Sequence, residues 1–252
     1  EFELAELKLL VDSVQSSKFI TKKKSDILIK KLEGLTSRHL GKELQRQVYV
    51  ADRLKVTNET VYYNVSHLHN AITENKKIRF KYFTYNQEKK KVLRNDGNDY
   101  IVSPYNLVFS EDNYYLICHY PKNERLTHFR VDKMSDIRMD DEKRKDISEV
   151  MGKSFNLGEY MKNTFDMFGG DTKKVSLVCE NSLINAIIDR FGEDITIRKN
   201  NENTFVVSVS VNVSPTFFAW VFTFGGKMKI MAPESVAEEF KNIAEKMTAE
   251  ER

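Results

Sequence analysis

The chain predicts an α+β protein with N-terminal helices, a small antiparallel β-barrel and a C-terminal domain of alternating strands and helices. Three observations in its 252 residues lead to this fold class. Apolar residues recur at helical spacing up to Ile72, and the apolar period changes to two between Lys77 and Met139. After Gly169-Gly170 the pattern becomes strand, helix, strand, strand, helix, strand, helix.

The N-terminal segment predicts helices that bury little apolar surface as an isolated pair. Residues 4–17 carry apolar residues at helical spacing, and Thr21 is a suitable N-cap for a second helix. A third helix is expected from Asn58 onward, while residues 38–57 are basic and ambiguous. A short helical pair of this kind must pack on another domain or on a second copy of the chain.

Residues 76–139 predict about five short antiparallel strands, which favour a small, strongly curved sheet or barrel. Asp96-Gly97 is a typical hairpin turn, and we expect it to join a strand over residues 89–94 to one that starts at Tyr100. Ser103-Pro104 is expected to break the ladder that follows.

Residues 140–172 have the composition of a linker, charged at first and then rich in aromatic residues and methionine. The β-α-β-β-α-β order over residues 173–252 is the split βαβ, ferredoxin-like pattern. Ser214 is predicted to cap its second helix, with Pro215 at the first helical position. Its strands are expected near residues 175–179, 195–199, 204–213 and 228–231.

Charge and composition narrow the functional class. The chain has 40 basic and 37 acidic residues, a net charge of +3, which is too mild for a whole-chain nucleic-acid clamp. Cys118 and Cys179 lie in separate apolar runs and indicate buried, reduced thiols in a cytoplasmic protein; a disulfide or a reactive thiol is the alternative. No apolar run approaches the ~18 residues of a membrane span. The chain starts without Met in mid-pattern, as expected of a fragment.

The strand register of the central hairpin follows from its turn. If Lys122-Asn123 is a two-residue loop, Leu116 faces Phe129 and Tyr115 faces Arg130. The apolar face, expected in the core, carries Tyr114, Leu116, Cys118, Thr127, Phe129 and Val131. The opposite face gathers a phenol, two imidazoles and a guanidinium among Tyr115, Ile117, His119, Leu126, His128 and Arg130.

This second face has the residue types that bind anions. The arginine fork matches phosphate geometry, and tyrosine and histidine add stacking surfaces and hydrogen-bond donors. The alternative is that Tyr115 and Arg130 form an ordinary cross-strand cation–π pair. From the residues alone both interpretations stay open.

No catalytic motif accompanies these residues. The sequence lacks Cys-x-x-Cys, His-Glu-x-x-His, a phosphate-binding glycine loop and Gly-x-Ser-x-Gly, so we expect no enzyme activity, no cofactor and no metal site. An aromatic-rich helix at residues 217–224 leaves a second function open, a protein-interaction module without nucleic-acid affinity.

Three motifs resemble the WYL domain of bacterial transcriptional regulators: Ser103-Pro104-Tyr105, Tyr114-Tyr115-Leu116 and the run from His128 to Met134. They occur in the expected order and spacing, although Tyr114 replaces the tryptophan that gives the family its name. The C-terminal segment, with Phe191-Gly192 and Trp220–Gly225, is similar to the extension that follows WYL domains. The resemblance spans about residues 70–250.

The resemblance implies an Sm-like barrel over residues 76–139 and linker and dimerisation helices over residues 1–75. It implies a ligand-controlled regulator that acts as a homodimer. Operator DNA would be bound by an N-terminal winged helix-turn-helix domain, whose pattern we do not find before residue 4. The effector would be single-stranded nucleic acid or a nucleotide.

The resemblance also carries over the ligand-binding residues: Ser103, Tyr105, Tyr115, His128, Arg130 and Lys133. His128 and Lys133 occupy positions where the family often has arginine, which lowers the expected affinity for phosphate. Arg190 in the C-terminal extension is a further candidate. The hairpin register places Tyr105 on the core face and adds His119 on geometry alone.

Overall fold

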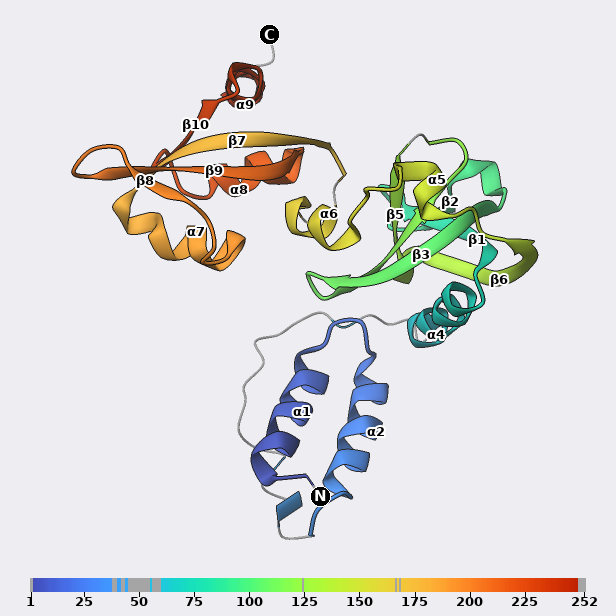
Figure 1. Ribbon diagram of the computed structural model, residues 1–252. Helices are drawn as coiled ribbons and strands as arrows, with labels where there is room; N and C mark the ends of the chain where they lie inside the picture. Colours follow the sequence, from blue (N-terminus) through green and yellow to red (C-terminus); the bar gives the residue numbers. More distant parts are fainter. Residues whose placement is uncertain are drawn as a thin grey trace. The chain divides into compact units, whose positions relative to one another are not determined.

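A computed structural model describes residues 2–37, 40, 41, 44, 55, 60–123, 125–165, 167 and 169–248. The chain divides into two compact units, Glu1–Lys153 and Ser154–Arg252 (Figure 1). Each unit combines helices with one antiparallel sheet, so the predicted α+β class is confirmed. No helix in the described ranges is both long enough and apolar enough to span a membrane.

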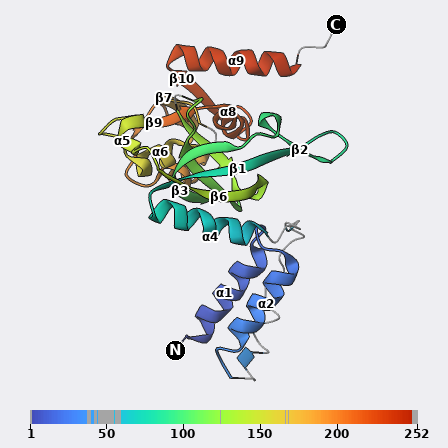
Figure 2. The same cartoon turned by 90° about the vertical axis from the view of Figure 1, so that its right-hand side faces the viewer.

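The first two helices form the predicted N-terminal pair, α1 (Leu4–Ser16) and α2 (Lys22–Glu33). Figure 2 shows them side by side. They pack around Leu7 and Val11, whose side chains are almost completely buried, together with Leu44. The pair is thus a small helical hairpin with a narrow apolar seam.

Thr21 caps α2 as the sequence predicts. Its Oγ1 accepts a hydrogen bond from the backbone N–H of Lys24 at 3.2 Å, which satisfies one of the amides that a helix start leaves unpaired. The predicted helix start at Asn58 and nearly all of residues 38–57 lie outside the described residues.

The sheet of the first unit has six strands: β1 (Lys76–Tyr85), β2 (Lys91–Leu93), β3 (Tyr100–Ser110), β4 (Asn113–His119), β5 (Leu126–Arg130) and β6 (Met134–Lys143). Their order is β2-β1-β3-β4-β5, with β6 also paired to β1, and the sheet curls into a half-barrel. Helix α4 (Thr60–Thr73) covers it through Leu68 and Ala71, and the buried Asn64 amide donates to the Met134 carbonyl at 3.0 Å.

The prediction that Asp96-Gly97 joins β2 to β3 as a hairpin is wrong. β2 instead pairs with β1, because Asn86 makes the turn before it: Asn86 Oδ1 accepts from the backbone N–H groups of Glu88 and Lys90. Asp96 and Gly97 do adopt positive φ angles of 53° and 75°, but in the isolated 3-10 turn η1 (Asn95–Gly97).

The predicted register of the β4–β5 hairpin is confirmed, with Tyr115 opposite Arg130 and Leu116 opposite Phe129. The apolar face packs in the core of the first unit, where Leu116 and Phe129 are buried. Ser103-Pro104 does not end a strand. A β-bulge between Pro104 and Asn106 lets β3 continue past the proline.

Residues 140–172 contain more structure than their linker composition indicates. β6 extends to Lys143, and two short helices follow, α5 (Ile147–Met151) and α6 (Leu157–Asn163). Phe165 then inserts into the core of the second unit. The boundary between the two units falls after Lys153.

The second unit contains the predicted succession of elements: β7 (Asp171–Glu180), α7 (Ile184–Phe191), β8 (Ile197–Lys199), β9 (Thr204–Val213), α8 (Pro215–Phe222), β10 (Met228–Ala232) and α9 (Glu234–Thr248). Short 3-10 turns, η2 (Val131–Lys133) and η3 (Asn181–Leu183), precede β6 and α7. The strand order of its antiparallel sheet is β10-β7-β9-β8.

One face of this second sheet packs against the helices. Val175, Leu177 and Val207 point into a core that contains Phe217 and Phe218 from α8, both buried. The aromatic helix is therefore mainly a core element. Both cysteines, Cys118 and Cys179, are buried and free, as the favoured interpretation of the sequence holds.

Candidate functional site

Arg130 is held in a defined position on the curved sheet by two side chains. Its Nε and Nη2 donate to the Asp132 carboxylate at 3.0 and 2.9 Å, and Nη2 also donates to Asn113 Oδ1 at 2.8 Å. The Arg130 side chain keeps 36% of its surface exposed. The hydrogen bonds with Asp132 outweigh partial burial and raise the pKa of Arg130, so its charge is permanent.

The Nη1 end of the Arg130 guanidinium stays available for a ligand. Of the five N–H donors of an arginine, three are engaged by Asp132 and Asn113. Nη1 makes no hydrogen bond with any residue in the described part of the chain. An anion can therefore bind this end without displacing Asp132, and the carboxylate keeps the fork oriented.

Tyr115 and His128 lie beside Arg130 on the same face of the hairpin. Tyr115 is directly opposite Arg130, and His128 is two residues before it on β5; both side chains are half-buried. Ile117, which follows Tyr115 on this face, is completely buried. The face is therefore not one continuous polar surface, because the buried, apolar Ile117 lies at its centre.

A second polar group lies at the other end of the same face, where Ser103 and His119 are opposite each other on β3 and β4. Ser103 is buried, and its Oγ accepts a hydrogen bond from the backbone N–H of Lys145 at 3.0 Å. Burial, followed by the charges of Lys145 and Lys77, lowers the pKa of His119. His119 thus lies in a region of positive potential.

Arg144 and Lys145 are candidate site residues that the sequence does not single out. They lie in the segment of linker composition, yet Arg144 Nη1 donates to the Pro104 carbonyl at 2.7 Å, and its guanidinium lies 5.6 Å over the Tyr105 ring. The only sequence signal for these two residues is that they belong to a run of charged residues at the end of β6. What places it against β3 is a contact about forty residues away in sequence, which no local pattern encodes.

Two further predicted site residues are placed less favourably for ligand binding. Tyr105 is buried, as its core position requires, and burial raises its pKa to about 12. Its hydroxyl has no hydrogen-bond partner among the described residues. Lys133 lies in η2 and is half-buried, and no described contact joins it to Arg130.

Arg190 belongs to the second unit, on the last turn of α7. Its Nη2 donates to the backbone carbonyl of Thr164 at 3.0 Å, and its guanidinium lies 3.9 Å over the Phe165 ring. These contacts anchor the segment that precedes β7 to α7. Arg190 is therefore a structural arginine as well as a candidate ligand contact.

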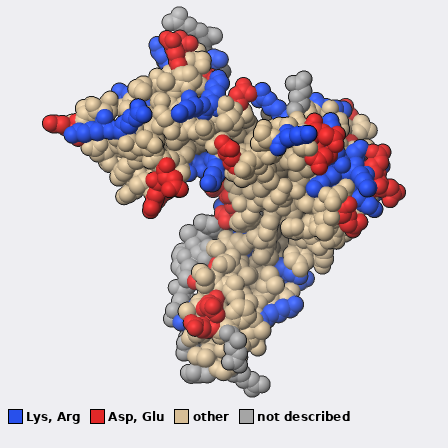
Figure 3. All heavy atoms as spheres, in the orientation of Figure 1, with Lys and Arg blue, Asp and Glu red and all other residues tan. Residues whose placement is uncertain are grey.

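Charges of both signs are interspersed over the first unit (Figure 3). Several are paired across the sheet, including Arg79 with Asp140, and Lys77 with Glu142 at 2.6 Å. Within each pair the opposite charges cancel, so the pairs add little to long-range attraction of an anion. Selectivity on this surface must come from the local geometry around Arg130 and His119.

Comparisons with known proteins identify one domain in each of the two units. Residues 63–139 match the model of the WYL domain, and residues 171–248 match that of the WCX domain. No curated protein matches the chain.

Two solved structures are similar over nearly the whole chain. Proteasome accessory factor B/C (PafBC) of Arthrobacter aurescens is 16% identical over 96% of this chain, with a TM-score of 0.33. A structure described as a CRISPR Cas-related protein is 14% identical over 97%, with a TM-score of 0.47. This chain spans 35% of the first protein and 70% of the second, and neither likeness defines a function for it.

The two domain matches confirm the resemblance that the three motifs indicate. The WYL match includes the Ser103, Tyr115 and Arg130 motifs, and the WCX match begins at the first residue of β7. The chain therefore contains a WYL domain followed by a WCX domain.

Proposed function

We propose that this chain is the ligand-sensing and dimerisation portion of a bacterial transcriptional regulator. Its WYL domain binds an anionic ligand of nucleic-acid or nucleotide type. The observation that carries the proposal is the position of Arg130. Asp132 and Asn113 hold its guanidinium in place, and its Nη1 end, beside Tyr115 and His128, makes no hydrogen bond within the described residues. Nη1 supplies a phosphate contact, and the aromatic rings supply surfaces on which a base stacks.

We infer that the WYL sheet is an Sm-like barrel and that the WCX domain is ferredoxin-like. The curled six-stranded sheet supports the first inference. The β7-α7-β8-β9-α8-β10 succession, with the strand order β10-β7-β9-β8, supports the second. The proposal also takes the protein to be cytoplasmic, for which the buried, free cysteines are the support.

The proposed mechanism is a shift between two conformations of a homodimer. A ligand changes their ratio only through its different affinity for each, so contacts around Arg130 must differ between them. The operator is contacted by a winged helix-turn-helix domain, as the family resemblance implies. Exposed apolar side chains on α1 and α2, Leu9 at 68% and Ile27 at 41%, favour a dimer through these helices.

The decisive experiment is a fluorescence-anisotropy titration of labelled single-stranded DNA with the chain and with Arg130→Ala. Loss of a charge-assisted hydrogen bond predicts affinity weakened roughly tenfold to a hundredfold. The wild-type affinity should fall as salt rises, with a smaller slope for Arg130→Ala.

Arg79→Ala is the matched control for this titration, because Arg79 is also an ion-paired arginine of the same sheet and lies on β1. It should bind as the wild type does. Equal losses in both variants, or salt-independent binding, contradict a specific Arg130 contact.

The alternative function is a protein-interaction module without nucleic-acid affinity. The observation in its favour is Phe222 of α8, which is 38% exposed and stacks on Phe240 at 4.3 Å. Phe217 does not contribute to such a surface, because it is completely buried. This alternative predicts no binding of DNA, RNA or nucleotides and a partner complex that is lost in Phe222→Ser. In either case we propose a binding role rather than a catalytic one.

A further inference from the structure

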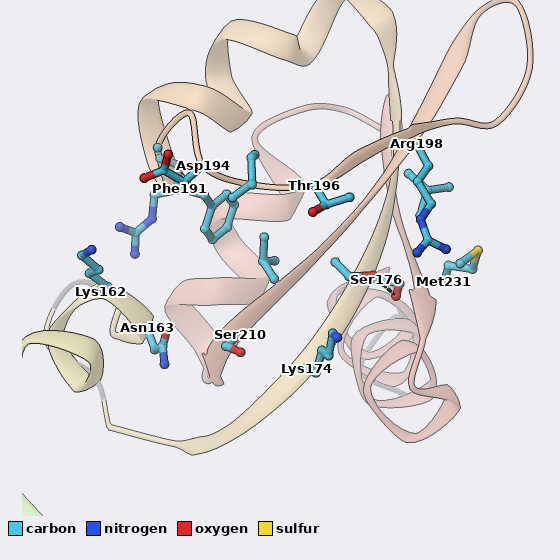
Figure 4. A pocket seen from close by; sticks show the side chains of 16 residues that line it. Lys162, Asn163, Lys174, Ser176, Phe191, Asp194, Thr196, Arg198, Ser210 and Met231 are labelled. Carbon is cyan, nitrogen blue, oxygen red and sulfur yellow. Dashed lines mark hydrogen bonds between the residues drawn. The ribbon is translucent and has the colours of Figure 1, made fainter. Parts of the chain in front are cut away.

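The WCX domain contains a cavity of about 950 Å³ against its sheet (Figure 4). Strands β7, β8 and β9 form its floor, and α6 and the segment 190–196 line its edges. All of these elements belong to the second unit. The cavity therefore belongs to the unit that does not contain Arg130.

The strand pattern explains why the sheet is hollow on this face. Val175, Leu177 and Val207 point into the core, so the residues that alternate with them point the other way. On the two central strands these include two small hydroxyl residues: Ser176 lies opposite Ser208, with their Oγ atoms 2.8 Å apart. Small side chains here leave space where larger residues would fill it.

Cations surround this hydroxyl-lined floor. Lys162 comes from α6, Lys174 from β7 and Arg198 from β8. Within the described ranges, none of these three side chains makes an ion pair or a hydrogen bond. Arg190 adds a fourth positive charge, and Asp194 is the single acidic residue of the lining.

This charge balance favours a ligand with several negative charges. Lys162, Lys174 and Arg198 differ from Arg130, because no carboxylate among the described residues pairs with them. A phosphate group matches both kinds of donor, since its oxygens accept from ammonium, guanidinium and serine hydroxyl groups at once. Pockets of about 300–1,000 Å³ are typical for small-molecule ligands, so the volume suits a mononucleotide or dinucleotide.

We propose that the WCX cavity is a second anion site that binds a phosphate-bearing ligand through Lys174, Arg198 and Lys162, with Ser176 and Ser208 beneath it. The phosphate can belong to a free nucleotide or to the phosphorylated end of a strand. The inference does not depend on the function proposed for the WYL surface.

Isothermal titration calorimetry of the full chain with inorganic pyrophosphate, in phosphate-free buffer, tests this site. We expect Lys174→Ala/Arg198→Ala to weaken binding about tenfold or more, because two charge-assisted contacts are removed. Arg79→Ala, a change in the other unit, should bind pyrophosphate as the wild type does.

The matched control is Lys173→Ala/Lys199→Ala, which removes the same net charge from the next positions of the same strands, outside the cavity lining. If the control variant lost as much affinity for pyrophosphate as Lys174→Ala/Arg198→Ala does, the proposed site would be overturned. The loss would then follow from the change in net charge alone. Absence of pyrophosphate binding by the wild type at millimolar concentration would overturn it as well.

Three further ligands identify the source of the phosphate: a dinucleotide with a 5′-phosphate, the same dinucleotide without it, and a 5′-phosphorylated oligonucleotide. The site predicts that the unphosphorylated dinucleotide binds at least about tenfold more weakly than the phosphorylated one. Tighter binding of the oligonucleotide assigns the site to strand ends, and tighter binding of the dinucleotide assigns it to free nucleotides. Equal affinity with and without the 5′-phosphate would overturn a phosphate site.

Discussion

At the scale of single residues, His119 reports the electrostatic state of the WYL surface. Lys145 and Lys77, after burial, hold its pKa below the ordinary value of about 6.5. His119 is therefore mostly neutral at pH 7. A bound anion offsets the two lysines, so it favours the protonated imidazole and raises the pKa.

This predicts a coupling between pH and ligand affinity. The sign follows from linkage: a ligand that raises the pKa of His119 binds more tightly as pH falls through the pKa of the bound state. Titration of the His119 ring protons by NMR, with and without single-stranded DNA, measures the shift. A His119→Gln variant assigns the resonance and should lose this part of the pH dependence. An unchanged His119 pKa in the complex would place the anion away from the Ser103–His119 group.

At the scale of elements, the cap of α8 is a specific point of stability in the WCX domain. Ser214 is buried, and its Oγ accepts from the Phe217 backbone N–H at 3.3 Å. Helix α8 in turn supplies Phe217 and Phe218 to the core. The cap thus fixes the helix that fills the space beneath the sheet.

Ser214→Ala should lower the free energy of unfolding of this domain by about 1 kcal/mol. Trp220, the single tryptophan of the chain, lies on α8 and reports its unfolding by fluorescence in a urea titration. Ser235→Ala, at an exposed position of α9, is the control and should change stability by less than about 0.5 kcal/mol. A shift of equal size in the two variants would contradict the role of the cap.

Elements with strong local signals could be predicted from the sequence. The strand predicted at residues 204–213 is observed as Thr204–Val213, because alternating apolar residues and a capping Ser214 mark both its course and its end. The β4–β5 register also follows from its turn, so Tyr115 and Arg130 are opposite each other as predicted. These features depend on neighbours in sequence.

Features that depend on distant contacts could not be predicted. A strand is predicted at residues 89–94 and is observed as β2 (Lys91–Leu93), but its pairing with β1 instead of β3 does not follow from the Asp96-Gly97 signal. Arg144 reaches the site through the Pro104 carbonyl, far away in sequence. The burial of Ile117 in the middle of the polar face is likewise a tertiary effect that alternation alone does not show.

At the scale of the whole molecule, the proposed regulator works as a homodimer through α1 and α2. Leu9 of α1 and Leu35, two residues after the end of α2, are 68% and 57% exposed, while the seam between the helices is buried around Leu7. Large exposed leucines on a helical hairpin are typical of a surface that another chain covers.

Leu9→Glu should therefore shift the chain from dimer to monomer in sedimentation velocity, without loss of helical content by circular dichroism. Met247→Glu on α9 is the control, because this methionine is even more exposed, at 76%, and lies in the other unit. The Met247→Glu variant should still sediment as a dimer. A wild-type chain that sediments as a monomer at micromolar concentration would contradict the proposal.

The carboxylate of Asp132 affects which anions the proposed sensor binds weakly. Arg130 and Asp132 together carry no net charge, so chloride or a lone carboxylate gains little by approaching them. A phosphodiester chain brings several charges and bases at once, and its added stacking outweighs what a simple ion can offer. In the proposed sensor, Asp132 would therefore favour binding of a polyanion that carries bases over binding of the small anions that are abundant in the cell.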